Sequence, residues 1–289
     1  MKKIILVFAA LLLCFAAFAE PLKKSVIRAE SVHSSILSKD VTYNVYLPAG
    51  YDETGEYPVI YLLHGLSDTY KAWEVRGGIK IVADELIASG ELRPVVIICP
   101  NAGDPDVHNL WNGYFNMPGY PYEDFFFNEF VPAVEQRHHI VSDKGHRAIM
   151  GLSMGGGGSV VYCQHHPEMF SSCYSMSGWL DNKNKDGEII SSEKVDKLYY
   201  VSKAVSDNSA IDFVAGADEA TLEKLRSVKW FIDCGDDDYL LEVSLGLYRQ
   251  MRQKGVKAEL RVRDGWHSWE YWHTALRLSL PFASRNFER

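Results

Sequence analysis

Ser153 stands in a sequence context that can turn a serine hydroxyl into a nucleophile. It occupies the centre of Gly151-Leu152-Ser153-Met154-Gly155, a G-x-S-x-G pattern. The apolar run 148–150 precedes the pattern, and residues 159–163 read as a helix after it. A strand, a sharp turn and a helix in this order form a nucleophile elbow, in which the glycines leave space for close packing. The helix would also direct its N–H groups at the reacting centre.

A serine hydroxyl is a weak nucleophile and needs a base, which in turn needs an orienting carboxylate. In open α/β sheets, ligands bind beyond the carboxyl ends of the strands, so the base should follow a strand. His267 lies on the loop after the last predicted strand. His165 and His166 are predicted to cap the end of the helix that follows Ser153, and His273 falls inside the last helix. We therefore predict His267 as the general base.

The orienting acid is expected after the predicted strand 229–234, where three aspartates are adjacent. We choose Asp238 because it is farthest from the strand end and begins the following helix, although spacing alone leaves Asp236 and Asp237 open. Calcium binding is a competing interpretation, but the spacing does not fit an EF-hand loop. Neither a metal nor another cofactor is expected.

An oxyanion hole requires two N–H donors directed at the developing negative charge. One donor is expected to be Met154, which directly follows the nucleophile. The other should come from the loop after the strand 59–63, where His64-Gly65-Leu66 offers the Leu66 N–H. We interpret His64 as structural, a hydrogen-bonded side chain that shapes this turn.

The elements that must position these residues alternate between strands and helices from residue 58 to the end. Residues 25–47 show two alternating strands, which indicate an antiparallel edge with one solvated face. The remainder predicts a doubly wound, mostly parallel α/β sheet with helices on both faces. We expect one domain over 20–289. A polar insertion at 181–227, with one or two helices, is a candidate cap over the site. The predicted strands are 59–63, 95–100, 148–150, 170–176, 229–234 and 258–262, and the predicted helices are 79–88, 125–138, 240–254 and 268–280.

Residues 1–19 have the features of a cleavable signal peptide. Lys2 and Lys3 precede an apolar run, and Ala17-Phe18-Ala19 is an A-x-A cleavage site before Glu20. We therefore expect a secreted or periplasmic protein with no membrane insertion after cleavage. The formal net charge is −8 and no basic patch is present, which argues against a nucleic-acid partner.

The four cysteines beyond the signal peptide are expected to be free thiols. Each lies in a predicted buried strand or in a helix beside one, where cysteine usually serves as a small apolar residue. No C-x-x-C pattern and no zinc-ligand spacing occurs in the sequence. The four residues are Cys99, Cys163, Cys173 and Cys234.

Together these motifs resemble the putative-esterase family of α/β-hydrolases, which includes feruloyl esterases, acetyl esterases and esterase D-like enzymes. The resemblance covers nearly the whole chain beyond the signal peptide, in order. In that family the acid is the aspartate three residues after the glycine, which implies Asp238 here. The matching segments are Tyr61-Leu62-Leu63-His64-Gly65-Leu66, Met150-Gly151-Leu152-Ser153-Met154-Gly155-Gly156, Asp233-Cys234-Gly235-Asp236-Asp237-Asp238 and Gly265-Trp266-His267-Ser268-Trp269.

The resemblance implies an exported esterase that acts on acyl esters of plant cell-wall carbohydrate, feruloyl or acetyl. Trp111 and Trp179 each follow a strand end, and aromatic walls suit flat acyl groups or sugar faces, so both are predicted to bind substrate. Two alternatives remain open. The chain could transfer the acyl group to a sugar acceptor, or it could bind carbohydrate without catalysis on a hydrolase scaffold.

Overall fold

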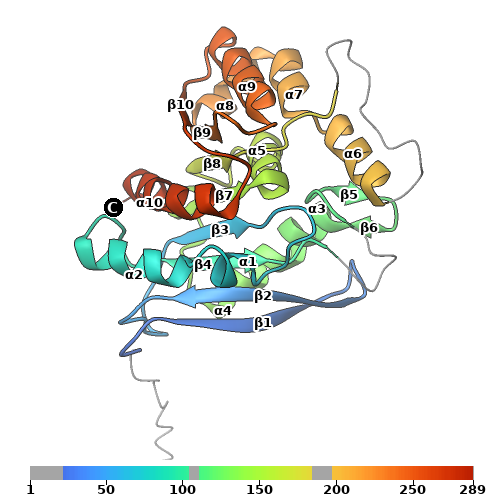
Figure 1. The fold of residues 1–289 in the computed structure, drawn as a ribbon. Coiled ribbons are helices and arrows are strands. Elements are labelled where there is room, and N and C mark those ends of the chain that lie inside the picture. Colours follow the sequence, from blue (N-terminus) through green and yellow to red (C-terminus); the bar gives the residue numbers. More distant parts are fainter. Residues whose placement is uncertain (1–21, 104–110, 184–196, 289) are drawn as a thin grey trace, which may run out of the picture.

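A computed structural model describes residues 22–103, 111–183 and 197–288. The predicted signal peptide and part of the 181–227 insertion lie outside these residues. A single eight-stranded sheet runs through the molecule in the order β1-β2-β4-β3-β7-β8-β9-β10 (Figure 1). Its strands are β1 (Val26–Ser34), β2 (Lys39–Leu47), β3 (Val59–Leu63), β4 (Val96–Pro100), β7 (Arg147–Leu152), β8 (Ser172–Met176), β9 (Lys229–Gly235) and β10 (Ala258–Arg263).

The direction of the strands confirms the predicted mostly parallel sheet. β1 pairs antiparallel with β2, and β2 pairs antiparallel with β4. From β4 across to β10 every neighbouring pair is parallel. The central strands β3, β4, β7 and β8 are buried along their whole length, as the continuous apolar sequences of β3 and β4 predict.

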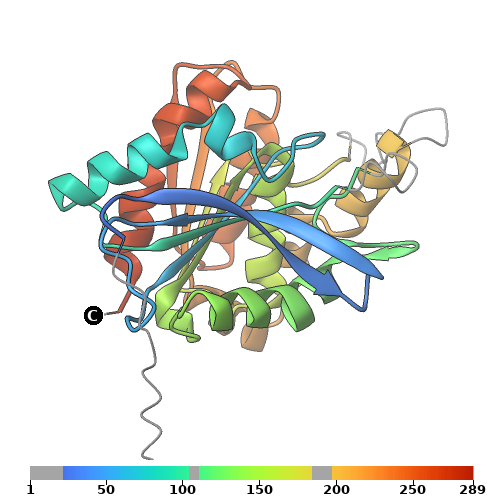
Figure 2. The same ribbon diagram turned by 90° about the horizontal axis from the view of Figure 1, so that it is seen from below.

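Helices cover both faces of the sheet, as predicted (Figures 1 and 2). Their apolar side chains form two separate cores, one on each face. The first face carries α1 (Ala72–Val75), α2 (Ile79–Ser89) and α10 (Trp269–Asn286). The second carries α3 (Tyr122–Phe125), α4 (Val131–Arg137), α5 (Ser153–His165), α7 (Ala210–Gly216), α8 (Glu219–Arg226) and α9 (Leu241–Gln253).

Three segments differ from the sequence-based expectation. The helix predicted at 125–138 begins earlier, at Tyr122, and contains a π-helical stretch, η1 (Phe126–Phe130), in which the rings of these two phenylalanines stack 5.6 Å apart. Between the predicted strand 95–100 and the predicted helix 125–138, where no strand is expected, a short hairpin is present, β5 (Asn116–Met117) and β6 (Tyr120–Pro121). The described part of the insertion holds three helices rather than one or two, because α6 (Lys197–Asp207) and α7 precede α8. A short 3₁₀ turn, η2 (Lys144–His146), leads into β7.

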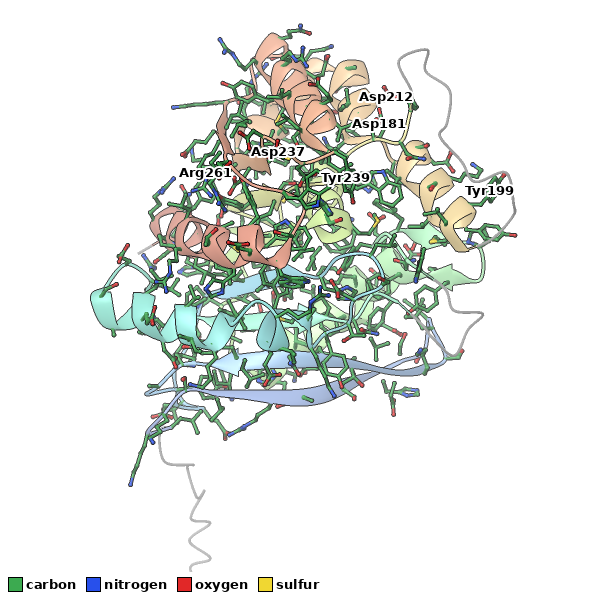
Figure 3. All side chains as sticks on the ribbon, viewed as in Figure 1. Asp181, Tyr199, Asp212, Asp237, Tyr239 and Arg261 are labelled. Atoms are coloured by element: carbon green, nitrogen blue, oxygen red, sulfur yellow. The ribbon has the colours of Figure 1, made fainter. Side chains whose placement is uncertain are left out.

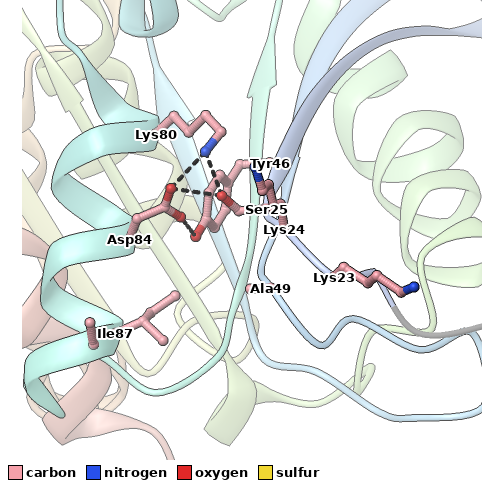
Figure 4. A pocket seen from close by; sticks show the side chains of 9 residues that line it. Lys23, Lys24, Ser25, Tyr46, Ala49, Lys80, Asp84 and Ile87 are labelled. Atoms are coloured by element: carbon pink, nitrogen blue, oxygen red, sulfur yellow. Dashed lines mark hydrogen bonds and ion pairs between the residues drawn. The ribbon is translucent and has the colours of Figure 1, made fainter.

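The antiparallel edge of the sheet is fastened to helix α2 by a polar cluster. Lys80 Nζ donates hydrogen bonds to Ser25 Oγ and Asp84 Oδ2, both at 2.6 Å (Figure 4). The Tyr46 hydroxyl donates to the other Asp84 oxygen at 2.7 Å. These contacts join the start of the described chain and β2 to α2, far from the strand ends that carry the predicted site residues.

The four predicted free thiols are buried and form no disulfide in the part of the chain that the structure describes. Across the same residues, no helix combines the length and the apolar character needed to span a bilayer.

Candidate active site

Ser153 lies at the sharp turn between β7 and α5, where the sequence predicts a nucleophile elbow. Its backbone is left-handed, with φ of +51°, which is rare for a residue with a side chain. A Cβ on Gly151 would lie 2.5 Å from the Gly155 carbonyl oxygen, and a Cβ on Gly155 would lie 2.5 Å from the His64 carbonyl oxygen. Glycine at both positions therefore lets the strand, the helix and the loop after β3 pack around the serine.

The structure brings Ser153, His267 and Asp238 into one hydrogen-bonded chain. His267 Nε2 lies 3.0 Å from Ser153 Oγ, and His267 Nδ1 lies 2.8 Å from Asp238 Oδ2. Because the carboxylate only accepts, Nδ1 carries the proton and Nε2 is free to accept the serine proton. Asp238 follows β9 and His267 follows β10, so neighbouring parallel strands deliver both to the same edge of the sheet.

Burial distinguishes Asp238 from the two aspartates before it. Asp238 is only 4% exposed, whereas Asp236 and Asp237 are exposed. Burial raises the pKa of Asp238, but hydrogen bonds from His267, the Leu240 N–H and Ser177 outweigh it and leave this pKa below its ordinary value. The carboxylate facing His267 is therefore held ionised. Asp236 instead accepts a hydrogen bond from the Gly265 N–H at 3.0 Å, which steadies the loop that carries His267.

The two predicted oxyanion donors lie beside the nucleophile. A Cβ on Gly65 would lie 3.7 Å from Ser153 Cβ, so the turn that carries Leu66 is packed against the serine. Within the described residues, the Leu66 N–H donates no hydrogen bond to the protein. Met154 is in the first turn of α5, where backbone N–H groups have no partner inside the helix. The role of both N–H groups as oxyanion donors stays a prediction.

His64 shapes this turn, in agreement with its structural interpretation. Its Nε2 accepts a hydrogen bond from the Ala102 N–H at 3.1 Å, and its Nδ1 therefore donates to the Gly65 carbonyl at 2.8 Å. Burial lowers the pKa of His64 to about 4. A neutral imidazole thus ties the loop after β3 to the segment after β4.

Ser153 opens into a cleft of about 490 Å³. Tyr239, labelled in Figure 3, contributes to its wall, and its ring lies 4.5 Å from the His267 ring.

The two predicted substrate-binding tryptophans are half-buried against the core and lie outside the lining of this cleft. The Trp179 N–H donates to the Ser153 carbonyl at 2.9 Å, so its backbone supports the elbow. The binding role of Trp111 and Trp179 stays a prediction. Other residues of the cleft wall are Leu66, Ser67, Asp68, Arg76 and Trp269.

The other histidines after Ser153 lie elsewhere, as predicted. His165 Nδ1 lies 2.7 Å from Glu123 Oε1, and His166 Nε2 lies 3.6 Å from the same oxygen. Both side chains thus face this carboxylate, while His166 is the C-cap residue of α5, as predicted, and its backbone N–H donates to the Tyr162 carbonyl at 2.9 Å. His273 Nδ1 donates to the Gly77 carbonyl at 2.7 Å.

Sequence reasoning missed two contributions to the site. Ser177 directly follows β8 and forms a hydrogen bond with Asp238. Its position at a strand end is the signal that could have identified it. Asp68 and Arg76 line the cleft at Ser153. The placement of Asp68 two residues after Leu66 is a comparable signal.

Comparison with known proteins identifies similar sequences and structures. The sequence profile of the family described as "Putative esterase" matches residues 34–283. A solved structure of a ferulic acid esterase is 44% identical to this chain, with a TM-score of 0.85, and covers 91% of this chain and 99% of its own. An S-formylglutathione hydrolase from Staphylococcus aureus, 18% identical, has a TM-score of 0.71 over 90% of this chain and 99% of its own, a likeness of fold alone.

A curated relative places a similar segment inside a longer protein. The endo-1,4-beta-xylanase/feruloyl esterase of Xylanibacter ruminicola is 25% identical over 268 residues, which is 91% of this chain. The chain spans 32% of that protein's length. With the family profile matched over most of the sequence, and with the doubly wound sheet and elbow in place, the chain has the α/β-hydrolase fold and belongs to the putative-esterase family.

Proposed function

We propose that this protein is an exported serine carboxylic-ester hydrolase that acts on acyl esters of plant cell-wall carbohydrate. The observation that carries the proposal is the hydrogen-bonded chain from Ser153 through His267 to Asp238, at the carboxyl edge of the sheet. The 44% identity to a ferulic acid esterase favours an aromatic acyl group over acetate.

Acyl transfer would proceed in two steps. In the first, Ser153 Oγ attacks the ester carbonyl carbon while His267 Nε2 takes the hydroxyl proton. The Leu66 and Met154 N–H groups would receive the oxyanion. Collapse of this intermediate breaks the bond to the alcohol oxygen, and His267 Nε2 returns its proton to that oxygen. Asp238 orients the ring throughout and stabilises its cation.

In the second step, water attacks the acyl-enzyme carbonyl. His267 Nε2 takes a proton from the water and then returns it to Ser153 Oγ as the carboxylic acid leaves. Splitting the reaction through a covalent intermediate replaces one difficult step with two easier ones. The products are the free acid and the alcohol.

The test is hydrolysis of methyl ferulate and p-nitrophenyl acetate by the purified protein and by its Ser153→Ala variant. We expect turnover of methyl ferulate, and a loss of rate on the order of 10⁶-fold in the variant, because the nucleophile is absent. Ser159→Ala is the matched control. This serine is buried in the same helix and donates to the Gly155 carbonyl at 2.7 Å, so its loss should leave turnover largely intact.

Different outcomes separate the parts of the proposal. Turnover of the acetate ester alone would retain the serine mechanism and move the substrate towards acetylated carbohydrate. Equal rates for the Ser153→Ala variant and the wild type would refute the mechanism.

Export rests on the sequence of residues 1–19 and has its own test. Expression of the whole chain in a bacterial host should give a periplasmic or secreted product whose N-terminal residue is Glu20. Intact-mass measurement identifies this residue directly. A cytoplasmic product that keeps residues 1–19 would contradict the proposal.

A further inference from the structure

An ion pair that the proposed mechanism does not use lies in the cleft at Ser153. Arg76 donates to Asp68 Oδ1 at 2.9 Å, and both residues line the cleft. The Asp68 side chain is only 16% exposed, whereas that of Arg76 is 54% exposed. A mostly buried carboxylate and a solvent-exposed guanidinium therefore line the cleft that contains the nucleophile.

Asp68 lies very near the reacting centre. A Cβ on Gly65 would lie 3.4 Å from Asp68 Oδ2 and 3.7 Å from Ser153 Cβ. Within the described residues, Oδ2 of Asp68 accepts no hydrogen bond, so it remains available to a ligand. Burial raises the pKa of Asp68, although Arg76 partly offsets this effect. A free acceptor thus borders the position of the ester group.

Arg76 and Trp269 form the neighbouring wall. The Arg76 guanidinium lies 5.0 Å from the centre of the Trp269 ring, and Trp73 fixes that ring edge-on at 5.2 Å. Trp269 follows His267 by two residues and lines the cleft with it. Because His267 must return its proton to the alcohol oxygen, the alcohol part of the ester lies on the His267 side of the cleft. We place Trp269 on that side because it follows His267 by two residues, and Arg76 with it because the guanidinium lies over its ring.

The chemistry of this wall selects a class of alcohol. A carboxylate beside a guanidinium accepts and donates hydrogen bonds within a few ångströms, which matches neighbouring hydroxyl groups that do both. The Asp68–Arg76 pair carries no net charge and therefore does not select a charged alcohol, and an alkyl alcohol would desolvate the pair without replacing its hydrogen bonds. An aromatic ring alongside suits the apolar face of a sugar.

From this arrangement we infer that Asp68, Arg76 and Trp269 form a subsite for a neutral sugar as the alcohol part of the ester. The inference rests on the proposed function and deepens it. Asp68 and Arg76 bind the sugar hydroxyls, and the sugar leaves as a free alcohol with the proton from His267.

The test compares a feruloyl ester of arabinose with methyl ferulate, which share the acyl group and differ in the alcohol. For Asp68→Asn and Arg76→Ala, the ratio of kcat/KM for the sugar ester to that for the methyl ester should fall about 10-fold or more, because hydrogen bonds to charged groups are lost. Lys71→Ala is the control. It removes an exposed cation from the same segment, outside the cleft, and should leave the ratio unchanged.

If the kcat/KM values for both esters fell equally and their ratio stayed unchanged, the sugar subsite would be refuted. The ion pair would then serve to position the turn that carries Leu66. Binding of free arabinose to the Ser153→Ala protein, followed by saturation-transfer NMR, tests the subsite independently of hydrolysis. We expect a signal that Arg76→Ala removes, and a signal that persists in this variant overturns the inference. If wild type cleaves neither ester, the proposed function fails, and the arabinose measurement still decides the subsite.

Discussion

Trp272 Nε1 donates a hydrogen bond to the Ser177 hydroxyl at 3.1 Å. The Ser177 hydroxyl also helps to lower the pKa of Asp238, and because a carboxylate only accepts, the serine is the donor in that interaction. The edge of the Trp272 ring in turn lies against His267, with ring centres 4.8 Å apart. A tryptophan of α10 therefore steadies the histidine directly and the aspartate through a serine.

Loss of the Ser177 hydroxyl should weaken catalysis without removing a reacting group. Ser177→Ala deprives Asp238 of one hydrogen bond and leaves the Trp272 N–H without its acceptor. We expect kcat on methyl ferulate to fall roughly 10-fold, which corresponds to about 1.4 kcal/mol, the scale of one hydrogen bond to a charged group. Ser175→Ala is the matched control because its hydroxyl donates to the Gly156 carbonyl, at 3.1 Å, and does not touch the three residues. Equal rates for both variants would contradict the role of Ser177.

Asp238 should be the member of the aspartate group on which hydrolysis depends. Asp238→Asn places an amide opposite His267 Nδ1 and favours the tautomer that presents a proton to Ser153. We expect kcat to fall about 10⁴-fold, the loss seen for this change in other serine triads. Asp237→Asn is the control, since Asp237 is exposed and its backbone rather than its side chain contacts the loop at Gly265. A large loss in the Asp237 variant and a small one in the Asp238 variant would refute the assignment.

The neutral His64 predicts that acid destabilises the protein before its carboxylates titrate. Its pKa is about 4 when folded, against an ordinary value of about 6.5 when unfolded. Between these values the unfolded chain binds a proton that the folded chain does not, so stability falls as pH falls. From pH 7 to 5 this group should cost about 2 kcal/mol of unfolding free energy.

Urea unfolding of wild type and His64→Gln at both pH values measures the contribution of His64. The variant should lose about 2 kcal/mol less than wild type over this interval. His138, whose pKa burial also lowers to about 4, contributes equally to both proteins. If wild type and variant lost the same unfolding free energy between pH 7 and pH 5, His64 could not be buried in its neutral form.

Asp233 should contribute more to the free energy of unfolding than the exposed ion pair between Glu259 and Arg285. It is fully buried and accepts hydrogen bonds from the Tyr174 hydroxyl at 2.6 Å, the Tyr271 hydroxyl at 2.5 Å and Arg261 at 2.7 Å. Asp233→Asn removes the charge that these donors share and should lower the unfolding free energy by about 3 kcal/mol. Glu259→Gln breaks the exposed pair with Arg285 and should cost less than about 1 kcal/mol. Chemical denaturation that ranks the two variants in the opposite order would disprove this.

Local sequence patterns were sufficient to predict the fold and the positions of Ser153 and His267. The elbow is specified by residues within a few positions of the serine, and the buried strands by continuous apolar runs. The choice among Asp236, Asp237 and Asp238 depends on which side chain the turn after β9 buries, and spacing does not determine that. We chose Asp238 from its distance to the strand end, and the resemblance to a family supported that choice.

Contacts between distant segments could not be predicted from the sequence. Ser177 and Trp272 are 95 positions apart, and their hydrogen bond exists only because α10 packs across the end of β8. The π-helical stretch at Phe126–Phe130, by contrast, has a local cause, since Pro132 follows it within the same helical run and has no N–H to donate to the carbonyl four residues earlier.

The hydrogen bond between Ser153 and His267 joins residues 114 positions apart. Closing so long a loop costs chain entropy, which pairing of the last two strands must offset, so we expect this contact to form late in folding. A chain that has ordered β7 and α5 holds the serine at its turn, yet no base stands beside it until β9 and β10 have joined the sheet. We therefore expect a chain in which β9 and β10 are not yet paired to carry an unreactive serine, so that reactivity of Ser153 would report completion of the sheet rather than collapse of the chain.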